Sequence, residues 1–82
     1  IKESYFETIL ITLNDELVMN YLNGNINYFS IHKVLLRLLK KPYFVKYYYD
    51  NPKNINDLKN MVMIVKNYLN KYLSKYENIK KY

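Results

Sequence analysis

The chain has 82 residues, a formal net charge of +6, one glycine, two prolines and no cysteine. Half of its residues are hydrophobic, which excludes a disordered chain, and the lack of cysteine excludes disulfides and thiolate metal sites. No apolar run approaches the roughly 18 residues of a membrane span, so we expect no membrane contact. We predict a single helical domain over residues 1–82, excised from a longer protein because the chain starts at Ile1.

The first predicted helix runs from Ser4 to Leu22. Ser4 followed by Glu7 matches a capping box, in which each side chain bonds to the other residue's backbone. Gly24 suits the left-handed position that ends many helices. The apolar residues between these points recur at helical spacing. They are Phe6, Ile9, Leu10, Leu13, Leu17, Tyr21 and Leu22.

The middle of the chain predicts a connection over residues 25–29 and then two helices separated by a proline. Ser30 is the expected N-cap of the sequence IHKVLLRLLKK, which is apolar nearly all round and therefore predicts a buried helix. Pro42 should end that helix and begin a short aromatic one, PYFVKYYY, because proline suits the first turn of a helix.

The last predicted helix covers residues 54–76, with Asn54 as its cap, Asp57 in its first turn and a fraying tail from Glu77. Its apolar residues keep one face for about five turns. We therefore expect an all-α fold, a small four-helix bundle with a short aromatic third helix and a long C-terminal helix at the centre of antiparallel neighbours. The residues expected to be most buried are Leu35, Leu38, Val62, Val65 and Leu69.

The sequence predicts no catalytic chemistry. His32 is the single histidine and has no second metal ligand at helical spacing, so we interpret it as an exposed or packing residue. Asp15 and Glu16 are adjacent and point about 100° apart on a helix, which prevents them from acting as a carboxylate pair. There is also no glycine-rich phosphate loop. We expect no enzyme activity, no metal and no cofactor within this chain.

Two surfaces are candidates for binding. Tyr43, Tyr47 and Tyr48, with Lys40 and Lys46, predict the rim of a groove for an amphipathic helix of a protein partner. The competing interpretation is that these tyrosines belong to the core, with their hydroxyls reaching water.

The alternative is a nucleic-acid surface made by the basic residues of the second helix. These residues are Lys33, Arg37, Lys40 and Lys41. Arg37 is the single arginine and the chain has no glutamine, so the groups that read base edges are scarce. We expect weak, sequence-independent DNA binding that disappears by physiological salt.

Three stretches together resemble the ACDC domain that accompanies Apetala-2-type DNA-binding domains in apicomplexan transcription factors. They are TILITLNDELVMNYL, VLLRLLKKPYFVKYY and INDLKNMVMIVKNYL. The resemblance implies a four-helix bundle in a nuclear protein that regulates transcription through protein contacts, with DNA bound by a separate domain. Pro42 interrupts what that family tends to run as one helix.

A second resemblance is carried by NDELVMNYLNGNINYFSI, together with Asp57 and the helix that follows it. This segment is similar to the C-terminal helical domain of deoxyxylulose phosphate reductoisomerase. That resemblance implies a domain that packs beside a catalytic centre held elsewhere in the protein. The start of the chain fits this family less well, and we rank it second to the ACDC domain.

Overall fold

The protein is helical throughout its regular structure. The computed structural model describes residues 4–80, and the side chains of residues 4–75. The helices are α1 (Tyr5–Leu22), α2 (Tyr28–Leu39), α3 (Pro42–Val45) and α4 (Ile55–Lys80), and residues 4–80 contain no strand. The predicted all-α fold, with a short third helix and a long last one, is confirmed.

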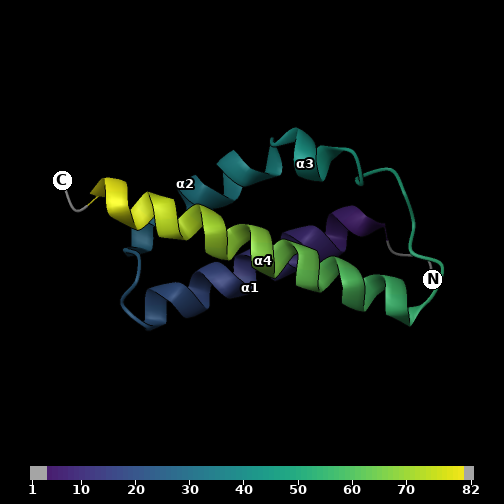
Figure 1. The fold of residues 1–82 in the computed structure, drawn as a ribbon, viewed down its shortest axis with the longest axis horizontal. Coiled ribbons are helices and arrows are strands. Elements are labelled where there is room, and N and C mark those ends of the chain that lie inside the picture. Colours follow the sequence, from purple (N-terminus) through teal and green to yellow (C-terminus); the bar gives the residue numbers. More distant parts are fainter. Residues whose placement is uncertain (1–3, 81–82) are drawn as a thin grey trace.

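Helix α1 is the centre of the molecule, because it packs along both α4 and α2. Figure 1 shows that α1 and α4 cross and run in the same direction. Helices α2 and α3 lie between them in the sequence and run back in the opposite direction. The contacts agree with this direction, since Tyr5 lies near Asp57 and the later residue Glu16 pairs with the later Lys66. The prediction of a central last helix among antiparallel neighbours is therefore wrong, because α1 is central and runs in the same direction as α4.

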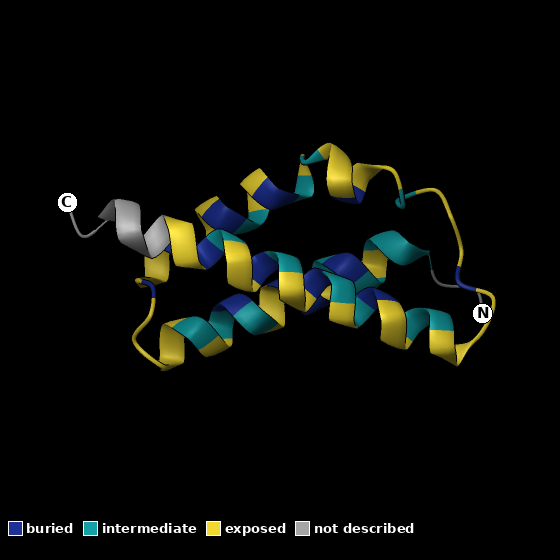
Figure 2. Cartoon of the chain, in the orientation of Figure 1, coloured by how far each residue is buried: buried dark blue, intermediate teal, exposed yellow. Residues whose placement is uncertain are grey.

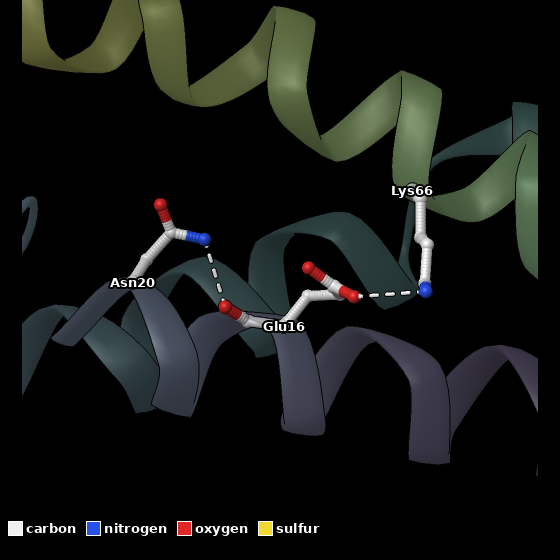
Figure 3. Close-up of polar contacts among 3 residues, drawn as sticks. All are labelled: Glu16, Asn20 and Lys66. Carbon is white, nitrogen blue, oxygen red and sulfur yellow. Dashed lines mark hydrogen bonds and ion pairs between the residues drawn. The ribbon is translucent and has the colours of Figure 1, made fainter. Parts of the chain in front are cut away.

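A polar contact marks the crossing of α1 and α4. Lys66 Nζ lies 3.4 Å from a carboxylate oxygen of Glu16 (Figure 3). One turn further along α1, the Asn20 amide donates to the Glu16 carbonyl at 2.8 Å. The Lys66 side chain is half exposed, so this ion pair contributes at most about 1 kcal/mol and apolar packing supplies most of the attraction.

The core lies where the inner faces of the helices meet (Figure 2). Its buried apolar residues come from every helix and from the loop after α1. They are Ile9, Leu13, Leu17, Ile26, Val34, Leu38, Phe44, Met61, Val65, Leu69 and Leu73. The predicted burial of Leu38, Val65 and Leu69 is confirmed, whereas Leu35 and Val62 are only half-buried.

Helix α2 is not buried all round, contrary to the prediction from its apolar sequence. Val34 and Leu38 face the core, but Leu36 is 46% exposed and Phe29 is 76% exposed. The reason is geometric. Helix α2 packs on α1 along one side, and α3, with 4 residues, is too short to cover the opposite side.

The start of α1 is placed correctly by the sequence, but the capping box does not form. Ser4 occupies the N-cap position in an extended conformation and makes no side-chain capping bond. The Tyr5 amide instead donates to the Asp50 carbonyl at 3.1 Å. The first turn of α1 is therefore held by the loop before α4, a partner that no local motif could reveal.

Helix α2 begins earlier than predicted. Asn27, not Ser30, is the N-cap, and its side-chain oxygen accepts from the Ser30 amide at 2.9 Å. The Ser30 hydroxyl donates to the same oxygen at 3.0 Å, and Ser30 itself is buried in the first turn. Asparagine and serine are both good caps, and the helix begins at the asparagine, three residues before the predicted cap.

The cap of α4 is as predicted. The Asp57 amide donates to Asn54 Oδ1 at 2.9 Å, and Asp57 Oδ2 accepts from the Lys53 amide at 2.9 Å. The first bond satisfies a donor of the first turn, and the second holds the residue before the cap and keeps a negative charge beside the helix start. At the other end the helix backbone continues to Lys80, beyond the predicted end at residue 76, and the fraying predicted from Glu77 stays a prediction. The side chain of Tyr76, predicted on the apolar face, lies outside the described residues.

The turn after α1 depends on Gly24, which has φ +80°. The Gly24 amide donates to the Tyr21 carbonyl at 3.0 Å and the Asn25 amide donates to the Asn20 carbonyl at 2.8 Å. This pair of bonds is the Schellman motif, and its residue at C′ requires a left-handed conformation.

Replacing Gly24 with alanine should lower the free energy of unfolding by about 1 kcal/mol. No atom lies within 4 Å of the position where a Cβ would be added, so the cost comes from the backbone and not from a clash. Gly24→Asn, which tolerates this conformation better, should cost less. Urea unfolding followed by circular dichroism checks both variants, and equal stability of wild type and Gly24→Ala would contradict the assignment of strain.

Leu38→Ala or Leu69→Ala should each cost about 2–5 kcal/mol, because both side chains are almost fully buried and their removal leaves a cavity. Leu22, which is 67% exposed, is the matched control, and Leu22→Ala should change stability by less than about 0.5 kcal/mol. The same urea titration measures all three. Similar losses for Leu22→Ala and Leu69→Ala would show that the described core is incorrect.

Candidate functional site

The aromatic residues around α3 are engaged with one another and with the flanking helices. Phe44 is fully buried and its ring meets Tyr68 of α4 edge-on at 4.9 Å. The ring of Tyr43 stacks on Tyr68 at 4.6 Å. Tyr47 approaches Tyr5 of α1 edge-on at 6.2 Å. Helix α3 thus joins α4 to the start of α1 through aromatic contacts, which supports the interpretation of these tyrosines as packing residues.

Tyr48 turns inward instead of toward the surface. Its ring meets Phe6 edge-on at 4.9 Å, and its hydroxyl donates to the backbone carbonyl of Leu39 near the end of α2. Partial burial raises the pKa of the Tyr48 hydroxyl above the ordinary value of 10.0. The hydroxyl is therefore a neutral donor, and its hydrogen bond ties Tyr48 to the end of α2.

The residues predicted as one partner-binding rim fall on separate surfaces. Lys46 Nζ lies 5.0 Å from the ring centres of both Tyr43 and Tyr47, so cation–π contacts hold these three together, with Tyr43 and Lys46 exposed and Tyr47 half-buried. Tyr48 faces the interior of this region, as described above. Lys40 lies with the basic residues of α2. Of the predicted rim, only Tyr43, Tyr47 and Lys46 remain together, and their partner-binding role stays a prediction.

The basic residues of the alternative site do come together. Lys33, Arg37, Lys40 and Lys41 line one shallow hollow of about 550 Å³, which also includes His32 and Leu36. We name these six residues the α2 outer face. Their nearness follows from helical spacing, because residues three and four apart share one side of a helix. The role of this face in binding nucleic acid remains a prediction.

A further hollow of about 350 Å³ joins the start of α1 to the start of α4, and no sequence pattern predicted it. Asn60, Met61 and Ile64 of α4 line it together with Tyr5, Tyr47, Asp50 and Asp57. Partial burial raises the pKa of Tyr5, and the negative charges of Asp57 and Asp50 raise it further. Asp57 already accepts a capping hydrogen bond, so its carboxylate acts structurally here.

Within residues 4–75, whose side chains are described, no group of three or more His, Asp or Glu side chains could hold a metal ion. His32 lies on the α2 outer face among cations, where we predicted an exposed or packing histidine, and its side chain is exposed. In the part of the chain that the structure covers, no helix is both long and apolar enough to cross a membrane.

Comparison with known proteins gives one partial similarity. The chain is 35% identical over 60 residues to 1-deoxy-D-xylulose 5-phosphate reductoisomerase of Pelagibacter ubique (strain HTCC1062). The aligned region covers 73% of this chain but only 16% of the relative, so the chain spans a small part of that protein. No family model matches the sequence, and no solved structure matches it significantly.

The similarity agrees with the resemblance that the sequence analysis ranked second. Nothing in the comparisons supports the ACDC domain, and a role in transcription, a separate DNA-binding domain and a nuclear location remain predictions without support. The segment NDELVMNYLNGNINYFSI, which suggested the reductoisomerase, covers the second half of α1, the Gly24 turn and the start of α2.

The two raised tyrosine pKa values predict a loss of stability at alkaline pH. Below about pH 10 both hydroxyls are protonated in the folded and unfolded states, so they do not make stability depend on pH. As pH rises past 10.0, the ordinary value, the unfolded chain loses these protons first, and the free energy of unfolding falls until the folded groups also titrate.

The double variant Tyr5→Phe plus Tyr48→Phe should therefore show a shallower decline above pH 10 than wild type. Tyr49, which is 94% exposed, provides the control, because Tyr49→Phe should keep the wild-type decline. Urea unfolding at pH values from about 8 to 11.5 spans the ordinary tyrosine pKa and measures the slopes. Identical slopes for wild type and the double variant would contradict the assigned pKa shifts.

Proposed function

We propose that this chain is a helical domain of a protein related to 1-deoxy-D-xylulose 5-phosphate reductoisomerase, and that it contributes structure rather than catalytic groups. The observation that carries the proposal is the identity of 35% over 60 residues to that enzyme. Those residues make up 16% of the relative, and the proposal assigns the reaction to other parts of the full-length protein.

The geometry supports a structural role. The carboxylate of Asp57 is used to cap α4, and that of Glu16 pairs with Lys66 across the α1–α4 crossing. Tyr48 donates its hydroxyl to a backbone carbonyl. A catalytic acid or base needs a reactive partner or a substrate within hydrogen-bond reach, and these polar groups are instead committed to holding helices together.

The proposal is tested in the full-length protein that contains this chain. That protein should show reductoisomerase activity toward 1-deoxy-D-xylulose 5-phosphate. Asp50→Asn, Asp57→Asn and Glu16→Gln should each leave kcat within about threefold of wild type once corrected for the folded fraction, because none of them touches reacting atoms.

Phe44→Ala is the contrasting variant, because loss of a fully buried aromatic side chain should cost about 3–5 kcal/mol. It should lower the amount of folded protein while the kcat of the molecules that remain folded stays nearly unchanged. Two results would overturn the proposal: no activity in the full-length protein, or a fall in kcat of about 100-fold for a single polar variant with an intact fold.

A further inference from the structure

We propose that Asn23 is a site of spontaneous deamidation, and that the folded turn after α1 restrains the reaction. The chain contains a single glycine, so Asn23-Gly24 is its single Asn-Gly dipeptide. In this reaction the backbone nitrogen of the following residue attacks the side-chain amide carbon of asparagine. Glycine permits the attack best, because it has no Cβ to obstruct the approach. The inference concerns the chemical stability of the turn and is independent of the proposed function.

The reaction has two steps and consumes only water. The Gly24 nitrogen bonds to Cγ of Asn23, the Cγ–Nδ2 bond breaks, and the proton lost by the Gly24 nitrogen leaves with Nδ2 as ammonia. The product is a five-membered succinimide ring. Water then adds to one of the two ring carbonyls and breaks its bond to the nitrogen. Cleavage at Cγ gives aspartate, and cleavage at the main-chain carbonyl carbon gives isoaspartate.

The side chain of Asn23 is available for this reaction. It is exposed, and among the residues whose side chains are described no hydrogen bond holds its amide. The neighbouring asparagines are held. Asn20 Nδ2 donates to the Glu16 carbonyl at 2.8 Å, and Asn25 Nδ2 donates to Asn20 Oδ1 at 3.0 Å. Asn23 therefore combines an unrestrained amide with the least obstructed following residue.

The folded backbone keeps the reacting atoms of the turn apart. The ring closes only when the Gly24 nitrogen is eclipsed with Cβ about the Cα–C bond of Asn23. The observed ψ of 1° eclipses it with the backbone nitrogen of Asn23 instead. The Gly24 amide also donates to the Tyr21 carbonyl at 3.0 Å. The turn must therefore open before the nitrogen can reach Cγ, and only molecules with an open turn react.

Both products destabilise the turn in which they form. Each carries a new carboxylate at the C-terminal end of α1, where the helix dipole disfavours negative charge. The last turn of α1 has no basic residue to offset that charge. Isoaspartate also inserts Cβ into the main chain, which displaces the Schellman hydrogen bonds. A molecule that has deamidated therefore opens this turn more often than before.

The test compares the 82-residue chain when folded and when denatured in guanidinium chloride, in the same mildly alkaline buffer. Peptides from a digest at low pH are analysed by mass spectrometry, which detects the replacement of NH₂ by OH. We expect Asn23 to deamidate in denaturant and at least about tenfold more slowly in the folded chain, because the open turn is a minor population. Asn25 is the internal control and should stay intact in both, because the β-branched Ile26 obstructs the attack.

Three substitutions separate the chemistry from its structural consequence. In denaturant, Gly24→Ala should slow the reaction at Asn23 by about tenfold, because the added methyl group obstructs the attack. Asn23→Asp reproduces one product and should raise the unfolding equilibrium constant by about two- to fivefold, as measured by urea titration. Asn67→Asp is its control, since it adds the same charge at an exposed position within α4 and should not destabilise the fold.

Three results would overturn the proposal. Equal rates at Asn23 in the folded and denatured chains would show that the turn does not restrain the reaction. A denatured chain in which Asn23 stays intact, or reacts no faster than Asn25, would show that Asn23 is not a deamidation site. Equal stability of Asn23→Asp and Asn67→Asp would remove the cost assigned to the product.

Discussion

The fold depends on the packing of α1 against α4. Ile9, Leu13 and Leu17 lie four residues apart on α1, so they form one narrow ridge, and all three are fully buried. Fully burying a side chain of this size contributes about 1.5–3 kcal/mol, in a domain small enough that its total stability is of the order of 5–15 kcal/mol. A few side chains at this crossing therefore provide much of the stability, and α2 and α3 complete the core around them.

Features set by neighbouring residues could be predicted from the sequence. Helix α1 has the predicted end at Leu22, because Gly24 supplies the left-handed residue that a Schellman turn needs. The cap of α4 by Asn54 and the break at Pro42 are also local and were predicted. The start of α2 was predicted wrongly because Asn27 and Ser30 are equally good caps, and only packing decides between them.

Features that depend on which helices meet could not be predicted in the same way. Periodicity shows that a helix has an apolar side, but it does not show how much of that side its neighbours cover. Leu36 and Leu38 look alike in the sequence, yet one is exposed and the other is buried, because only one side of α2 reaches α1. The central position of α1 follows from contacts with two helices, one of which lies far along the chain.

The same distinction applies to the candidate sites. Helical spacing alone brings Lys33, Arg37 and Lys40 to one side of α2, and the structure places them in one hollow. The hollow formed by Tyr5 with Asp50 and Asp57 joins the start of α1 to the start of α4, which are far apart in the sequence, so no spacing rule could reveal it. The tyrosines of the predicted rim share a sequence segment but not a single surface, since Tyr48 packs on Phe6 while Tyr43 and Tyr47 stay together at Lys46.

Amide hydrogen exchange on the folded chain tests most directly whether α1 is the structural centre. If it is, amides near Leu13 of α1 and Val65 of α4 should exchange only through global unfolding and share one free energy, equal to that from urea unfolding. Amides of α2 beyond the contact with α1 should exchange at lower free energies. The opposite order, with α1 opening before α2 while α4 stays protected, would contradict the account and make α4 the centre.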